Sequence, residues 1–109
     1  MNGQDLEIAQ MKAYKSMEES NAKALEKDKE KAEYEEQYDI ELAKEMLSLR
    51  ADGNPASMVE KVAKGKEEIA HIKFLSAVAE AEARASKENI NIKKKIFDSL
   101  EATKKRELG

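Results

Sequence analysis

The feature that most constrains this chain is the run Asp52-Gly53-Asn54-Pro55, which lies near the middle of 109 residues and contains the only proline. Glycine is common just after the last turn of a helix, and proline is common in the first turn of the next. Charged residues make up 39% of the chain and aromatic residues 5%, so helix formers are abundant and strand formers are few. The sequence therefore predicts an all-α fold, a long helical hairpin or coiled coil that turns at this run.

The first half is predicted to form one helix over about residues 2–51, with Asn2 as its N-cap. Apolar residues recur at helical spacing in this half, at Leu6, Ile8, Met11, Tyr14, Met17, Leu25, Ala32, Ile40, Leu42, Met46 and Leu49. Between residues 18 and 38 the stripe nearly disappears, and the candidates for a core there are Leu25, Ala32, Tyr34 and Tyr38. That stretch is expected to depend on helix propensity and charge pairs, or on a partner.

A short helix is predicted over about residues 55–64, and a long helix over about residues 66–106. Two caps fit the start of the short helix: Asn54 immediately before the proline, or a capping box formed by Ser57 and Glu60. Gly65 separates the two helices, because glycine inside a helix costs about 1 kcal/mol relative to alanine. The sequence leaves open whether Gly65 breaks the helix or only kinks it.

The C-terminal helix has the most regular apolar pattern in the chain, with the three-and-four spacing that is typical of helix packing. The candidate core or oligomer seam consists of Ile69, Ile72, Leu75, Ala79, Ala83, Ile90, Phe97 and Leu100. A flanking row widens it, with Val78, Ala85, Ile92 and Ile96. A stripe this wide is hard to bury against a first helix with a polar middle. A homodimer or a bound partner is therefore predicted for a single helical domain, residues 1–109.

The residues that usually carry chemistry are sparse. There is no cysteine, which excludes disulfides, thiol chemistry and cysteine-based zinc sites and fits a reducing compartment such as the cytoplasm. His71 is the only histidine and has no second nitrogen ligand near it in a metal-binding motif, so it is interpreted as structural. No catalytic, metal or cofactor-binding residue is predicted, and the chain is expected not to be an enzyme. No stretch approaches the roughly 18 apolar residues of a membrane span.

The charge is unevenly distributed between the two halves. Residues 1–54 carry 8 Lys and Arg against 14 Asp and Glu, a net charge of −6, whereas residues 55–109 carry 12 against 9, a net charge of +3. The two halves are therefore electrostatically complementary.

Two charged surfaces are candidates for binding a partner. The acidic candidates are Glu26, Asp28, Glu30, Glu33, Glu35, Glu36, Asp39 and Glu41. They either imitate nucleic acid toward a basic protein surface or form a solvated helix face. The basic candidates are Lys93, Lys94, Lys95, Lys104, Lys105 and Arg106. They either contact nucleic acid or stabilise the C-terminus of their helix.

The run from Asp52 to Gly65, with its Asn-Pro-Ala-Ser and Val-Ala-Lys-Gly motifs, resembles a family of small helical proteins of Gram-positive bacteriophages and prophages. The resemblance continues through Ile69-Ala70, Ala79-Glu80-Ala81 and Lys87-Glu88-Asn89-Ile90-Asn91, so that it covers about residues 52–100. It implies an early gene concerned with replication, recombination or host takeover, and a location in the cytoplasm of the bacterial host. It brings no catalytic residues, and the acidic first helix shows no matching motif.

Three functions are consistent with these observations. The preferred hypothesis is a non-enzymatic phage protein that binds and modulates or inhibits a host protein acting on nucleic acid, in its most specific form an anti-CRISPR protein. The first alternative is an accessory protein of phage replication or recombination that acts as a coiled-coil dimer and uses its basic clusters. The second alternative is a structural or scaffolding coiled coil. The sequence does not identify the partner protein.

Overall fold

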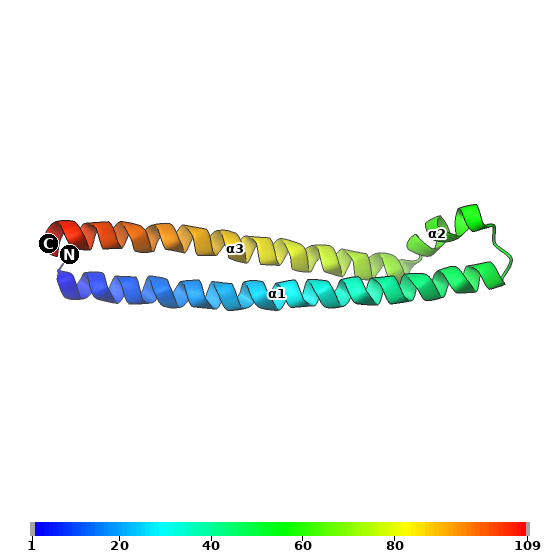
Figure 1. Cartoon of the computed structure of the whole chain (residues 1–109), viewed down its shortest axis with the longest axis horizontal. Helices are drawn as coiled ribbons and strands as arrows, with labels where there is room; N and C mark the ends of the chain where they lie inside the picture. Colours follow the sequence, from blue (N-terminus) through cyan, green and yellow to red (C-terminus); the bar gives the residue numbers. More distant parts are fainter. Residues whose placement is uncertain (1, 109) are drawn as a thin grey trace. The chain divides into compact units, whose positions relative to one another are not determined.

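The computed structural model describes residues 2–108 and contains three helices in that range, with no strand (Figure 1). Helix α1 spans Gly3–Ala51, α2 spans Ala56–Lys64 and α3 spans Glu67–Leu108. The predicted all-α helical hairpin is confirmed, and its helix boundaries agree within two residues. The predicted domain, residues 1–109, also includes Met1 and Gly109, which lie outside the described residues.

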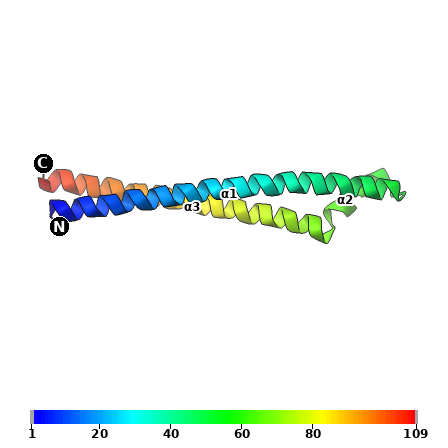
Figure 2. The same cartoon turned by 90° about the horizontal axis from the view of Figure 1, so that it is seen from below.

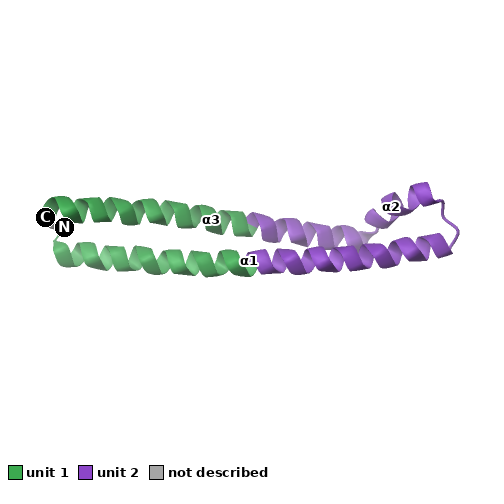
Figure 3. Cartoon of the chain, in the orientation of Figure 1, with its two compact units in different colours: residues 1–26, 82–109 green, residues 27–81 purple. Residues whose placement is uncertain are grey.

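The chain divides into two compact units, which are coloured separately in Figure 3. Unit 1 combines residues 1–26 with residues 82–109, and unit 2 consists of residues 27–81. Each unit therefore contains one stretch of α1 and one stretch of α3, and unit 2 also contains the turn and α2. The prediction of a single domain stays a prediction.

Asn2 caps the start of α1, as predicted. Its side-chain Oδ1 accepts a hydrogen bond from the backbone N–H of Asp5 at 2.9 Å. Its carbonyl oxygen accepts the first helical hydrogen bond from the N–H of Leu6 at 3.1 Å. These contacts satisfy backbone donors that the first helical turn would otherwise leave without a partner.

Gly53 ends α1 in a Schellman motif, in which a residue in the left-handed conformation reverses the chain. Its φ is +89°, and its N–H donates to the carbonyl of Arg50 at 3.0 Å. The N–H of Asn54 donates to the carbonyl of Leu49 at 3.0 Å, and the side-chain amide of Asn54 donates to the same oxygen at 2.9 Å. The side chain of Asn54 is thus used at the end of α1.

Both caps predicted for the start of α2 are wrong. Pro55 occupies the N-cap position, and no side chain there makes a capping hydrogen bond. Asn54 is unavailable because its amide turns back to α1, and Ser57 and Glu60 lie inside the helix rather than at its cap. Glu60 instead pairs with Lys64 at 2.6 Å, which lowers the pKa of the Glu60 carboxyl and raises the pKa of Lys64.

Gly65 breaks the helix rather than kinking it. Its backbone is right-handed, with φ −81° and ψ −10°, and its N–H is shared between the carbonyls of Lys61 and Val62, each at 3.2 Å. The chain then bends before α3 begins at Glu67. Lys66, which lies in this bend, donates from Nζ to Glu45 of α1 at 2.9 Å, and this hydrogen bond raises the pKa of Lys66.

The two glycines therefore respond differently to alanine. Gly53→Ala should lower the free energy of unfolding by about 1 kcal/mol, because an L-residue is strained at positive φ. Gly65→Ala should raise it by about 0.5 to 1 kcal/mol, because the φ is ordinary and a Cβ would meet only carbonyl oxygens at 3.5 Å. Urea denaturation followed by circular dichroism measures both. Equal effects of the two variants would contradict the assigned backbone conformations.

In unit 1, the beginning of α1 and the end of α3 lie side by side and run antiparallel (Figures 1 and 2). Leu6 and Ala24 of α1 and Ala83 and Ser86 of α3 are buried. Gln10 of α1, also buried, donates a hydrogen bond from its amide to the carboxylate of Glu101. The helices approach through small side chains, and polar groups at the edge of the seam are paired.

In unit 2, the end of α1 faces both α2 and the beginning of α3. Val59 and Ala63 of α2 and Ile69, Ile72 and Ala79 of α3 are buried. Lys31 Nζ of α1 lies 3.7 Å from Glu80 Oε1 of α3, and Lys66, in the bend before α3, pairs with Glu45 of α1. The short helix is thus held by a small apolar face.

The packed face of α1 differs from the predicted one. In unit 1 the buried and half-buried positions of α1 follow a three-and-four pattern at Leu6, Gln10, Ala13, Met17, Ser20 and Ala24. In unit 2 the half-buried positions continue at the same spacing with Lys27, Lys31, Tyr34, Tyr38, Glu41 and Glu45. Six predicted core candidates, Ile8, Met11, Tyr14, Leu25, Ala32 and Ile40, are exposed. The prediction was wrong there because α1 packs through small and amphipathic side chains, which leaves larger apolar residues outside.

Candidate protein-binding surfaces

The predicted acidic positions do not form one face of α1. Glu33 and Glu35, for example, lie on nearly opposite sides of the helix, about 160° apart around its axis. Several of these carboxylates form ion pairs with lysines of the same helix: Glu30 with Lys27, Glu33 with Lys29, Glu35 with Lys31, and Glu41 with Lys44. Asp28 is half-buried, whereas Glu26, Glu36 and Asp39 are exposed. This placement favours the solvated helix face over the nucleic-acid mimic.

The predicted basic patch is split between two surfaces. Lys93 and Lys104 point toward α1 in unit 1: Lys93 Nζ donates to Ser20 Oγ at 3.0 Å, and Lys104 Nζ lies 3.6 Å from Glu7 Oε1. Four cations of the patch are exposed, namely Lys94, Lys95, Lys105 and Arg106. The eleven-residue spacing does place Lys93 and Lys104 on one face, but that face packs against α1.

The predicted oligomer seam of α3 is used inside the chain. Ile69, Ile72, Ala79 and Ala83 are buried, and the other predicted seam residues, Leu75, Ile90, Phe97 and Leu100, are half-buried. Within each unit, α1 therefore already covers much of the apolar stripe of the α3 stretch that lies in that unit. Any surface that binds another protein must lie outside this seam or at its edges.

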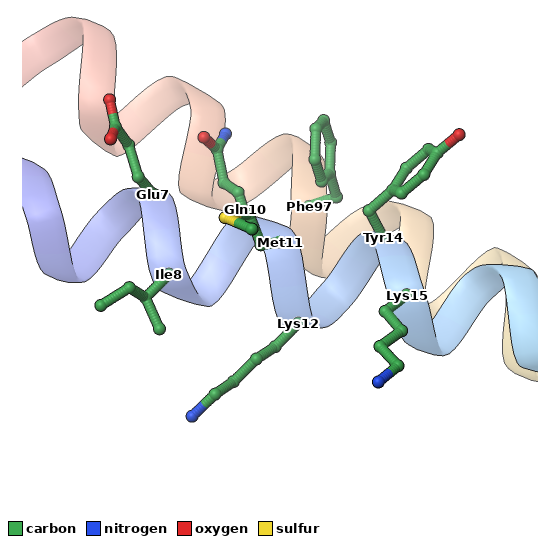
Figure 4. A pocket seen from close by; sticks show the side chains of 8 residues that line it. All are labelled: Glu7, Ile8, Gln10, Met11, Lys12, Tyr14, Lys15 and Phe97. Atoms are coloured by element: carbon green, nitrogen blue, oxygen red, sulfur yellow. The ribbon is translucent and has the colours of Figure 1, made fainter.

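An open apolar groove lies at one edge of the seam in unit 1 (Figure 4). Ile8, Met11 and Tyr14 of α1 and Phe97 of α3 supply its apolar surface, and the other lining residues are Glu7, Gln10, Lys12 and Lys15. In Figure 4, Tyr14 and Phe97 point to the same side of the view, whereas Lys12 and Lys15 point to the opposite side. Met11 is 71% exposed and Tyr14 is 56% exposed. Aromatic and methionine side chains gathered in this way are typical of protein-binding surfaces.

Sequence reasoning singled out these residues separately but did not bring them together. Met11 and Tyr14 were assigned to a core stripe of the first helix, and Phe97 to the seam of the last. The groove exists because residue 97 comes to lie beside residues 11 and 14. A second apolar stripe on the first helix indicates that one apolar face stays exposed. It does not predict which residues of the last helix lie beside that face.

His71 lies on the surface of α3 beside another aromatic ring. It is exposed and stacks on Phe74, with ring centroids 6.1 Å apart and an interplanar angle of 24°. Among residues 2–108, no group of three or more histidine or acidic side chains is placed to hold a metal ion. No helix within the same range is both long enough and apolar enough to cross a membrane.

Comparison with known proteins adds no relative. No family model matches this chain, and no curated protein or solved structure matches it either.

Proposed function

We propose that this chain is a non-enzymatic binding protein, which docks an amphipathic helix of another protein in the groove formed by Met11, Tyr14 and Phe97. The exposed apolar surface of this groove carries the proposal, because large side chains are left in water there although the same chain buries alanines and serines. Apolar helix faces commonly dock in such grooves, and methionine adapts to the shape of the partner. The occupant is expected to present two or three apolar residues at helical spacing.

The resemblance to phage proteins supports a more specific form of the proposal. In this form the partner is a host protein that acts on nucleic acid, and binding modulates or inhibits it, for example in CRISPR defence. The paired carboxylates of α1 offer little support for recognition by charge imitation. We therefore place the contact on the apolar groove rather than on the acidic positions. We also infer that the chain self-associates as a homodimer, because further apolar residues lie exposed on both units.

Affinity capture from infected and uninfected bacterial host cells tests this proposal. Met11→Glu should reduce recovery of the partner by about tenfold or more, because a charge placed in an apolar contact must be desolvated without a counterion. Leu47→Glu is the matched control, since Leu47 is 72% exposed in unit 2 and does not line the groove. Equal capture by the Met11 variant, the Leu47 variant and the unmodified chain would refute the assigned groove.

The exposed cations of α3 favour a second candidate, an accessory protein that contacts nucleic acid. Lys94, Lys95 and Lys105 are exposed, and no ion pair is recorded for them in the described part of the chain. Phosphate contacts by these lysines would weaken steeply as the salt concentration rises. A gel shift in low salt, followed by salt titration, separates this candidate from the first. If no shift occurs in low salt, direct nucleic-acid binding is excluded.

A further inference from the structure

A second apolar groove in unit 1 is built on different residues of α3. Ala9 and Ala13 of α1 face Ile96 and Leu100 of α3 across it. An adjoining hollow on α3 shares Ile96 and Leu100 and adds Ile92, so the two form one continuous surface. Ile92 is 56% exposed and Ile96 is 50% exposed. We call this surface the isoleucine groove.

All charged residues that line the isoleucine groove are lysines: Lys12, Lys93 and Lys95. Lys93 donates a hydrogen bond to the neutral hydroxyl of Ser20, and this contact does not compensate the positive charge of the lysine. No carboxylate lines the surface. An occupant must therefore combine apolar side chains with negative charge, because like charges at a contact repel and unlike charges attract.

The same chain carries a surface with the opposite charge. In unit 2, a hollow on α1 around Ile40 is lined by Glu33, Glu36, Glu41 and Gln37, and no cation lines it. Ile40 is 46% exposed and supplies the apolar centre. Glu33 and Glu41 form ion pairs with lysines at their helix surface, whereas none is recorded for Glu36 in the described residues. Glu36 is thus the carboxylate best placed to pair with an outside cation.

We propose that the isoleucine groove of one copy binds the Ile40 surface of a second copy, with Glu36 beside the lysines of the groove. Two isoleucine grooves would repel each other, and so would two Ile40 surfaces, which leaves the unlike pairing as the favourable one. This proposal rests on the homodimer inferred above and names its contact. Since each copy carries both surfaces, the contact either occurs twice in a closed pair or extends to further copies.

Charge reversal at both surfaces tests the contact by sedimentation equilibrium. Lys95→Glu and Glu36→Lys should each raise the dissociation constant of self-association by about tenfold, because an attraction becomes a repulsion. The combination of both changes should restore it to within about threefold of the unmodified value, since the reversed charges attract again. Circular dichroism checks that each variant retains its helix content.

Two control variants carry the same change in net charge at neighbouring positions. Lys94→Glu alters an exposed lysine that does not line the isoleucine groove, and Asp39→Lys alters an exposed carboxylate that does not line the Ile40 surface. Both should self-associate as the unmodified chain does.

The outcomes separate the contact from the homodimer and from the function. Equal weakening by Lys95→Glu and Lys94→Glu, or no recovery in the double variant, would overturn the contact but leave the homodimer standing. A monomer mass of the unmodified chain at every concentration would overturn the contact and the homodimer together. Capture of a partner through the Met11 groove is measured separately and would be unaffected by either result.

Discussion

Leu6→Ala is expected to lower the free energy of unfolding by about 2–5 kcal/mol, the range for a large buried side chain cut back to a methyl group. Leu6 is fully buried, with 0% of its surface exposed, and among the described residues it is the largest side chain buried to that degree. Urea denaturation monitored by circular dichroism measures the loss.

Leu25→Ala is the control for the Leu6 variant. It removes the same atoms from the same helix, but Leu25 is 63% exposed. The expected change is within about 0.5 kcal/mol, as for most surface substitutions. The sequence pattern had assigned both leucines to the core stripe of the first helix, so the comparison decides which face of α1 packs. If Leu25→Ala lowered the free energy of unfolding as much as Leu6→Ala, the assignment of the Leu6 face of α1 as the face that packs against α3 would be refuted.

Ala83→Leu is expected to lower the free energy of unfolding by about 1–3 kcal/mol, through crowding rather than through a cavity. Ala83 of α3 is 2% exposed, and unit 1 also buries Ser86, Ser20 and Ala24. Small residues in a seam let two helix backbones approach closely, so three added carbon atoms have no space unless the helices separate. Thermal or urea denaturation provides the measurement.

Ala85→Leu is the matched control, two residues further along the same helix. Ala85 is exposed, and leucine and alanine have similar helix propensities, so the expected effect is within about 0.5 kcal/mol. If Ala83→Leu were tolerated equally well, the close approach of the two helices in unit 1 would be refuted. Positions 83 and 85 would then tolerate leucine equally well, and the experiment would not distinguish a seam position from a flanking one.

The existence and the ends of the helices were determined by local sequence. The Asn2 cap and the turn at Gly53 each depend on backbone groups and side chains within a few residues, and local chemistry is sufficient to predict them. An interruption at Gly65 was predicted as well, but the sequence left open whether it is a break or a kink, and the structure has a break there. The seam of α3 was also readable, because its apolar residues keep a three-and-four spacing over many turns. The cap of α2 could not be predicted, because the side chain of Asn54 could either cap α2 or bond to the end of α1. In the structure it bonds to the carbonyl of Leu49 at the end of α1.

Which face of α1 packs, and therefore which surfaces remain for a partner, was decided by the tertiary structure. The first helix carries two stripes at helical spacing, one with Leu6, Ala13 and Ala24, the other with Ile8, Met11 and Leu25. Hydrophobicity alone favours the second stripe, but close packing against the alanines and serines of α3 favours the first, because small side chains on both helices allow close contact. Sequence by itself determined that the chain is helical and where it turns. The pairing of residues distant in sequence placed Met11 beside Phe97 and left that apolar surface open to another protein.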